Sequence, residues 1–80
     1  MAKGNSLTAS ERKILKAFGG KVRAIRERKK QSVYDLTGDD MPITNRQHWQ
    51  MIENGKKNIQ LITVFKIAEC LEVDPAELFK

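Results

Sequence analysis

Helix-start signals recur along this sequence, and no segment alternates apolar and polar residues as a β-strand does. Two of these signals have the capping-box spacing, in which a hydroxyl residue and an acid or amide three positions later each satisfy a backbone N–H. One pairs Thr8 with Glu11, and the other pairs Thr44 with Gln47. The pattern predicts an all-α fold of five helices joined by short connections.

The first predicted helix starts near Ala9 and runs to about Lys30. Its apolar residues recur at spacings of three and four, as they do on one face of a helix. They are Leu15, Phe18, Val22 and Ile25. The adjacent Gly19 and Gly20 cost about 1 kcal/mol each inside a helix. This pair therefore indicates a kink, a break or a close packing contact.

A short second helix is predicted over residues 33–37. Ser32 suits its N-cap position, and Val33 and Leu36 form an apolar pair on one face. The stretch GDDMP that follows contains glycine and proline, which both disfavour helix continuation. We expect the helix to end there.

The third predicted helix opens at the Thr44 capping box and ends at Asn54-Gly55. Glycine at this point suits the left-handed conformation that ends many helices. Trp49 and Ile52 are three positions apart, so they share one face. We expect that face to point into the core.

The most apolar helix is predicted to begin at Leu61. Its broad apolar face covers eleven positions, so we expect it to pack in the middle of the core. The face consists of Leu61, Val64, Phe65, Ile67, Ala68 and Leu71. The stretch DPAE at residues 74–77 then predicts a last helical turn with a cap and a first-position proline. That turn carries Leu78 and Phe79.

Positive charge is concentrated in the first part of the chain. Residues 1–30 hold ten Lys/Arg against two acids, a net charge of +8. Residues 31–57 have a net charge of −1 and residues 58–80 of −2. Such asymmetry favours a polyanionic partner such as nucleic acid, although a solvated helix face gives the same count.

Several classes of protein are not expected from the composition. The lone Cys70 excludes an intrachain disulfide and is interpreted as a small buried apolar residue. No apolar run is long enough for a secretion signal or a membrane span, so we expect a cytoplasmic protein. With His48 as the one histidine and no nucleophile motif, we expect neither an enzyme nor a metal site or cofactor.

The third predicted helix has a polar side that suits DNA. Opposite Trp49 and Ile52, or at the edge of that apolar face, lie Arg46, Gln47, Gln50 and Met51. Glutamine can pair with an adenine edge and arginine with a guanine edge in the major groove. The two lysines that follow Gly55 can lie beside phosphates.

These segments resemble the Cro/repressor-type (XRE-like) helix-turn-helix proteins of bacteria and their phages. The resemblance covers residues 18–79 and is strongest in IENGKKNIQLITVFKIAECLEVDPAELF, while GGKVRAIRERKKQSV is similar to the family's first helix. It implies a compact five-helix bundle of the lambda-repressor-like DNA-binding type over residues 18–80. Residues 1–17 are then an N-terminal extension, helical from about residue 9.

The resemblance also implies site residues. The family's base-reading positions fall on Arg46, Gln47 and Met51, with Asn45 directly before them, and Gln50 joins them from the same polar side. The predicted phosphate contacts are Ser32, Lys56, Lys57 and Asn58. Members of the family often pair an arginine of the first helix with the glutamate before Asn-Gly, which predicts an ion pair between Arg26 and Glu53.

Two positions depart from the family pattern. Val33 stands where many members have a glutamine that contacts phosphate, so we expect this contact to be absent. The connection from Leu36 to Trp49 is about two residues longer than usual and contains Asp39 and Asp40. These acids either cap a solvent-exposed turn or change the docking angle on DNA.

The sequence therefore predicts a sequence-specific transcriptional regulator that binds double-stranded DNA as a homodimer. Apolar residues available for pairing lie near Leu78, Phe79 and the N-terminal helix. An antitoxin or adaptor that holds a protein partner, with DNA binding secondary, is the alternative. RNA binding is disfavoured because the chain has only five aromatic residues for stacking.

Overall fold

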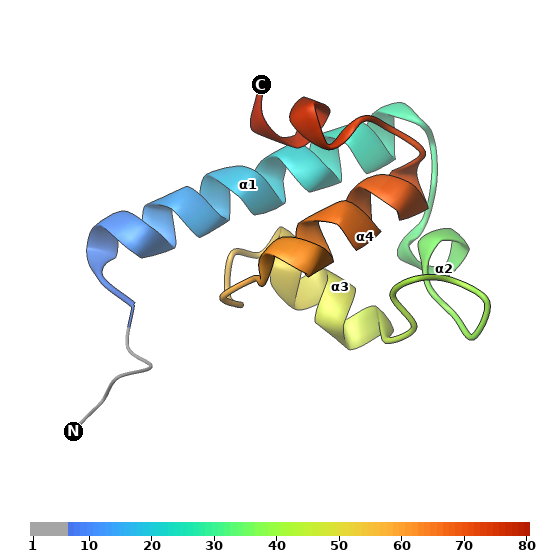
Figure 1. Cartoon of the computed structure of the whole chain (residues 1–80), viewed down its shortest axis with the longest axis horizontal. Helices are drawn as coiled ribbons and strands as arrows, with labels where there is room; N and C mark the ends of the chain where they lie inside the picture. The colour runs from blue at the N-terminus through green and yellow to red at the C-terminus, as the bar shows by residue number, and fades with distance from the viewer. Residues whose placement is uncertain (1–6) are drawn as a thin grey trace.

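Four α-helices and one 3₁₀ helix make up the structure (Figure 1), a computed structural model that describes residues 7–80. They are α1 (Ala9–Arg28), α2 (Val33–Leu36), α3 (Arg46–Glu53), α4 (Leu61–Leu71) and η1 (Pro75–Phe79). The all-α fold is confirmed, and residues 7–80 contain no strand. Of the five predicted helices four are α-helices, and the fifth, Pro75–Phe79, is a 3₁₀ helix instead.

α1 begins as the sequence predicts. The Glu11 backbone N–H donates to the Thr8 hydroxyl at 3.1 Å, and the Thr8 N–H donates to the Glu11 carboxylate at 2.9 Å. The helix then runs without a break through Gly19 and Gly20 to Arg28. It ends slightly before the predicted position.

Two glycines bring α1 and the end of α3 into close contact. A Cβ atom on Gly19 would lie only 2.5 Å from the carbonyl oxygen of Glu53. Gly55 has a φ of +69°, and a Cβ there would lie 2.6 Å from the Cα of Lys16. Of the three meanings that the Gly19-Gly20 pair allowed, the structure shows close packing, and it comes from Gly19.

α2 is held by its first turn. The Ser32 hydroxyl accepts the Asp35 N–H at 3.2 Å and the Asp35 carboxylate accepts the Ser32 N–H at 2.8 Å, so the predicted cap is confirmed. These hydrogen bonds lower the pKa of the exposed Asp35 carboxyl below its usual value. Leu36 ends the helix and is buried.

The predicted capping box at the start of α3 is wrong. The N-cap is Asn45, whose side-chain oxygen accepts the His48 N–H at 3.1 Å, and Thr44 lies outside the helix. Asparagine is at least as good an N-cap as threonine, so Asn45 takes the N-cap position instead of Thr44. The predicted end is confirmed, with Asn54 at the C-cap and Gly55 left-handed.

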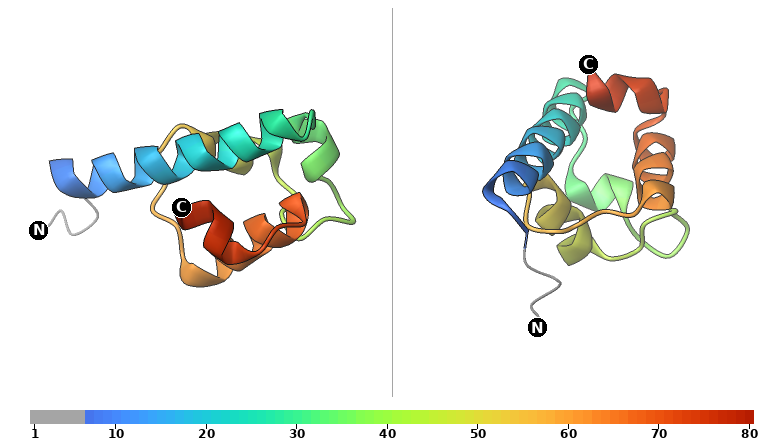
Figure 2. Two further views of the ribbon diagram at one scale, coloured as in Figure 1. Left: turned by 90° about the horizontal axis from the view of Figure 1, so that it is seen from above. Right: turned by 60° about the vertical axis from the view of Figure 1, so that its left-hand side comes forward.

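The core lies between all four α-helices and η1 (Figures 1 and 2). Its largest fully buried side chains are Trp49, Ile25, Leu36, Ile52, Ile67, Leu71, Leu78 and Val22. Cys70 is also buried, as predicted, and burial raises the pKa of its thiol. The ammonium of Lys29 donates to the Leu71 carbonyl oxygen at 2.7 Å, which ties the end of α1 to the end of α4.

The prediction that the whole apolar face of α4 lies in the core is wrong for two residues. Leu61 is 71% exposed and Phe65 is 48% exposed. Successive helix residues rotate by about 100°, so Phe65 turns away from the buried Val64, and Leu61 stands at the first position of the helix. With Ile62, they form an exposed apolar patch on the first half of α4.

Candidate nucleic-acid interface

The outward side of α3 is polar and open to solvent. All five predicted base readers, Asn45, Arg46, Gln47, Gln50 and Met51, are exposed. Trp49 and Ile52 on the opposite side are fully buried. α3 can therefore present one side to a ligand while its other side is fixed in the core.

Asn45 has a second role at this surface. Its side-chain oxygen caps α3, which leaves the NH₂ group of the amide as a donor. The first turn of α3 thus begins at a residue whose side chain is already oriented. Arg46 and Gln47 follow it directly as the first two residues of the helix.

Arg46 has a partner that the sequence did not predict. Its guanidinium carbon lies 4.3 Å from the ring centroid of Tyr34, which stands on α2 and is 69% exposed. α2 and α3 contact each other, so residues far apart in sequence meet here. The only signal in the sequence was a single tyrosine close to the helix cap at Ser32, and it does not identify a partner.

The predicted phosphate contacts lie around two helix ends. Ser32 is exposed at the start of α2, where its hydroxyl is engaged in the cap. Lys56, Lys57 and Asn58 are exposed in the turn after α3. That turn is fixed because the Gly55 N–H donates to the Ile52 carbonyl oxygen and the Lys56 N–H to that of Met51.

A buried hydrogen-bond network holds α3 in place. The Arg26 guanidinium donates to both carboxylate oxygens of Glu53, from Nε at 2.7 Å and from Nη2 at 3.1 Å. The Trp49 indole N–H donates to the same carboxylate at 2.7 Å. The remaining Arg26 Nη1 donates to the Gln31 carbonyl oxygen at 2.9 Å. The acceptor Glu53 raises the pKa of Arg26, so the arginine stays charged.

The longer connection between α2 and α3 is anchored to the core. Ile43 is buried within it, and Met41 packs against the core. The Thr37 hydroxyl donates to the Val33 carbonyl oxygen at 2.9 Å, which stabilises the start of the connection. Asp39 and Asp40 are exposed and make no ion pair with any described residue, which fits a turn that points to solvent.

His48 lies at the border between the polar face and the core. Burial lowers the pKa of its imidazole, and the nearby charges of Lys57 and Lys66 lower it further. The imidazole is therefore neutral around pH 7. It can donate or accept one hydrogen bond without adding a positive charge next to Lys57 and Lys66.

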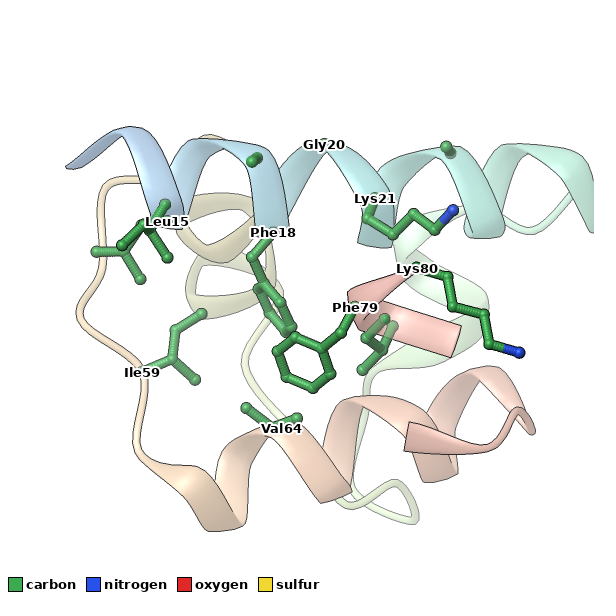
Figure 3. Close-up of a pocket in the computed structure, with 12 residues that line it drawn as sticks. Leu15, Phe18, Gly20, Lys21, Ile59, Val64, Phe79 and Lys80 are labelled. Carbon is green, nitrogen blue, oxygen red and sulfur yellow. The ribbon is translucent and has the colours of Figure 1, made fainter. Parts of the chain in front are cut away.

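A groove of about 670 Å³ opens between α1, α4 and η1, away from the outer face of α3 (Figure 3). Phe18 and Phe79 point into it, with ring centroids 5.5 Å apart. Leu15, Ile59 and Val64 extend its apolar lining. Leu78, which the sequence placed among the residues free for pairing, is buried, whereas Phe79 is 68% exposed.

Residues 7–80 also contain neither a cluster of metal ligands nor a membrane-spanning helix. No three His, Cys, Asp or Glu side chains gather there as a metal site requires. No helix in this part of the chain is long and apolar enough to cross a membrane.

The fold is similar to that of two solved regulatory proteins. The restriction-modification controller protein C.AhdI from Aeromonas hydrophila shares 30% sequence identity, and the match covers 84% of this chain and 98% of that one with a TM-score of 0.75. The clp gene regulator ClgR from C. glutamicum, at 17% identity, has the same fold, with a TM-score of 0.73 over 82% of this chain and 83% of that one. No protein-family model and no curated protein matches the chain.

Proposed function

The chain belongs to the Cro/repressor-type (XRE-like) helix-turn-helix DNA-binding family, and we propose that it is a sequence-specific transcriptional regulator that places α3 in the major groove. The observation that carries the proposal is the two-sided character of α3. Its buried side is fixed to α1 through Glu53, and its other side offers hydrogen bonds. A rigid helix with a polar outer side is what base reading requires.

The first turn of α3 holds the main readers in this proposal. Gln47 has an amide that can make two hydrogen bonds with an adenine edge, and Arg46 has a fork of donors that fits a guanine edge. Met51, one turn further along, contributes apolar contact. Asn45 and Gln50 complete the reading surface with their amides.

Phosphate contacts flank this surface. Lys56 and Lys57 lie in the turn after α3, beside Asn58, and Ser32 lies at the start of α2. Lys16 of α1 packs against the same turn at Gly55, so the basic first helix reaches the phosphate-contacting loop. This arrangement gives the excess positive charge of residues 1–30 a role in DNA binding.

We propose residues 18–80 as the DNA-binding domain and residues 1–17 as an extension, whose described part contributes the start of α1. Two copies of the chain would pair through the groove between α1, α4 and η1. The pair would then bind a two-fold DNA site. An apolar groove with the exposed Phe79 at its edge suits a second copy, and pairing doubles the number of base pairs that are read. An antitoxin or adaptor would use the same groove for a different protein.

Selection of bound sequences from random DNA tests the function. We expect enrichment of a two-fold repeat with half-sites about 34 Å apart, one helical turn of DNA. If no sequence is enriched while the protein binds all duplexes weakly, the regulator proposal fails and the protein-partner alternative gains support.

A further inference from the structure

Two arginines near α3 are held in different ways. Arg26 uses the edge of its guanidinium, since Nε, Nη1 and Nη2 all donate hydrogen bonds within the protein. Arg46 instead lies over the Tyr34 ring, with its guanidinium carbon 4.3 Å from the ring centroid. No side-chain N–H of Arg46 donates to a described residue, and none of the ion pairs in residues 7–80 involves it.

This difference decides what each arginine can do. A guanidinium is planar and carries its five N–H donors around the edge, so stacking on a ring leaves every donor available. Arg26 donates three hydrogen bonds to Glu53 and Gln31 and is structural. Arg46 is oriented while its donor fork remains free for the O6 and N7 atoms of guanine.

Tyr34 is a firm support although its ring is exposed. It is the second residue of α2, whose first turn is closed by the reciprocal Ser32 and Asp35 hydrogen bonds. The other end of this short helix is anchored by Leu36, which is 1% exposed. The ring therefore projects from a fixed backbone toward the first residue of α3.

We propose that Tyr34 is a positioning residue that sets the orientation of Arg46 and thereby sharpens discrimination at the base that Arg46 reads. The proposal rests on the proposed function, because it takes Arg46 as a reader. A free arginine side chain must be ordered when it meets a base, and this ordering costs conformational entropy. A ring that holds the guanidinium beforehand removes part of that cost from the binding step.

The test compares Tyr34→Leu with Tyr34→Phe. The first removes the aromatic face, and the second keeps the face and removes only the hydroxyl. We expect Tyr34→Leu to reduce discrimination at the Arg46 position by about two- to five-fold, the range of an exposed cation–π contact. Tyr34→Phe should retain the discrimination of the wild-type protein. Neither variant should change the salt dependence of binding, because no phosphate contact is lost.

The Arg46→Ala background shows whether Tyr34 acts through Arg46. In that background, Tyr34→Leu should cause no further loss of discrimination. A loss of the same size in both backgrounds would overturn the proposal. It would also be overturned if Tyr34→Phe weakened binding equally for all sequences, because the hydroxyl would then be contacting the DNA backbone itself.

A measurement without DNA tests the stacking alone. The side-chain methylene protons of Arg46 should be shifted upfield by the ring current in NMR spectra of the wild-type protein and of Tyr34→Phe, and this shift should vanish in Tyr34→Leu. An unshifted Arg46 in the wild-type protein would overturn the proposal. The melting temperature of each variant should equal that of the wild type, since the Tyr34 ring is exposed.

The proposed function and the role of Tyr34 can be rejected separately. Absence of any enriched sequence in the selection experiment rejects the proposed function, while the NMR shift still reports on the stacking. If Arg46→Ala changes the preferred base and Tyr34→Leu does not, only the role of Tyr34 is rejected.

Discussion

Arg26 of α1 and Glu53, the last residue of α3, are joined by two hydrogen bonds of 2.7 and 3.1 Å, and both side chains are nearly buried. Glu53 also accepts the indole N–H of Trp49. One carboxylate therefore connects the first helix, the core and the helix that carries the candidate base readers. The geometry of the candidate DNA-binding surface depends on this contact.

Glu53→Ala should lower the free energy of unfolding by about 3–5 kcal/mol, because it leaves the Arg26 charge without its partner in a mostly buried position. The melting temperature of this variant should fall clearly, while its base preference should remain that of the wild-type protein. Chemical unfolding at 25 °C measures the loss. Glu77→Ala, which removes the exposed pair with Lys80, is the control and should cost less than about 1 kcal/mol. Equal effects of the two variants would contradict a special role for Glu53.

Gly19→Ala and Gly20→Ala should have opposite effects on stability. A methyl group on Gly19 meets the carbonyl oxygens of Ile52 and Glu53, which should cost about 1–3 kcal/mol through overpacking. A methyl group on Gly20 meets nothing within 4 Å and should stabilise the helix by about 0.5–1 kcal/mol. Thermal unfolding of both variants checks the sign. A stable Gly19→Ala protein would mean that α1 and α3 do not pack as closely as described.

Gln47→Ala should separate base reading from phosphate anchoring. We expect it to cost about 1–3 kcal/mol on the best DNA site and to relax preference at one base position. The slope of log affinity against log salt should stay nearly unchanged, because no phosphate contact is removed. Binding to specific and scrambled duplexes at several salt concentrations measures both effects.

Lys57→Ala is the matched comparison for that experiment. It should weaken binding to every sequence alike and make the salt slope shallower by about one unit per lost phosphate contact. Were Gln47→Ala to lose affinity equally for both duplexes, α3 would not be the reading helix.

Phe79→Lys should disrupt pairing of two copies through the groove. The side chain is 68% exposed and packs on Phe18, so a charge at this position would face the partner's apolar surface. We expect affinity for the two-fold site to fall about ten-fold or more. Native mass measurement should show one copy bound per two-fold DNA site in place of two. Phe65→Lys changes the exposed patch of α4, outside the groove, and should leave the stoichiometry intact. Loss of pairing in that variant would place the interface on this patch instead of in the groove.

His48 should make stability depend on pH. Because burial lowers its pKa in the folded state, the unfolded chain takes up a proton first as the pH falls below about 6.5. The free energy of unfolding should therefore decrease from that pH downward and level off once folded His48 is also protonated. In His48→Gln this part of the decrease should be missing. Urea unfolding of both proteins between pH 7.5 and 5 measures this decrease. If the free energy of unfolding depended on pH in the same way in both, groups other than His48 would be responsible.

The sequence by itself determined the helices and the division of α3 into two sides. Helix starts and ends follow from local hydrogen bonds, such as the reciprocal pair of Thr8 and Glu11 or the left-handed turn at Gly55, and these need no distant contact. That Trp49 and Ile52 share one face of α3 follows from helical spacing alone. The choice between Thr44 and Asn45 as a cap was missed because two good capping residues stand next to each other.

Only the tertiary structure decided which of these surfaces meet. The pairing of Tyr34 with Arg46 and the contact of Gly19 with the end of α3 join residues that are distant in the chain. Their distances depend on how α1, α2 and α3 pack against one another. The exposure of Leu61 and Phe65 has the same origin, because an apolar pattern shows which face of a helix can be buried, whereas the neighbouring helices determine how much of that face they cover.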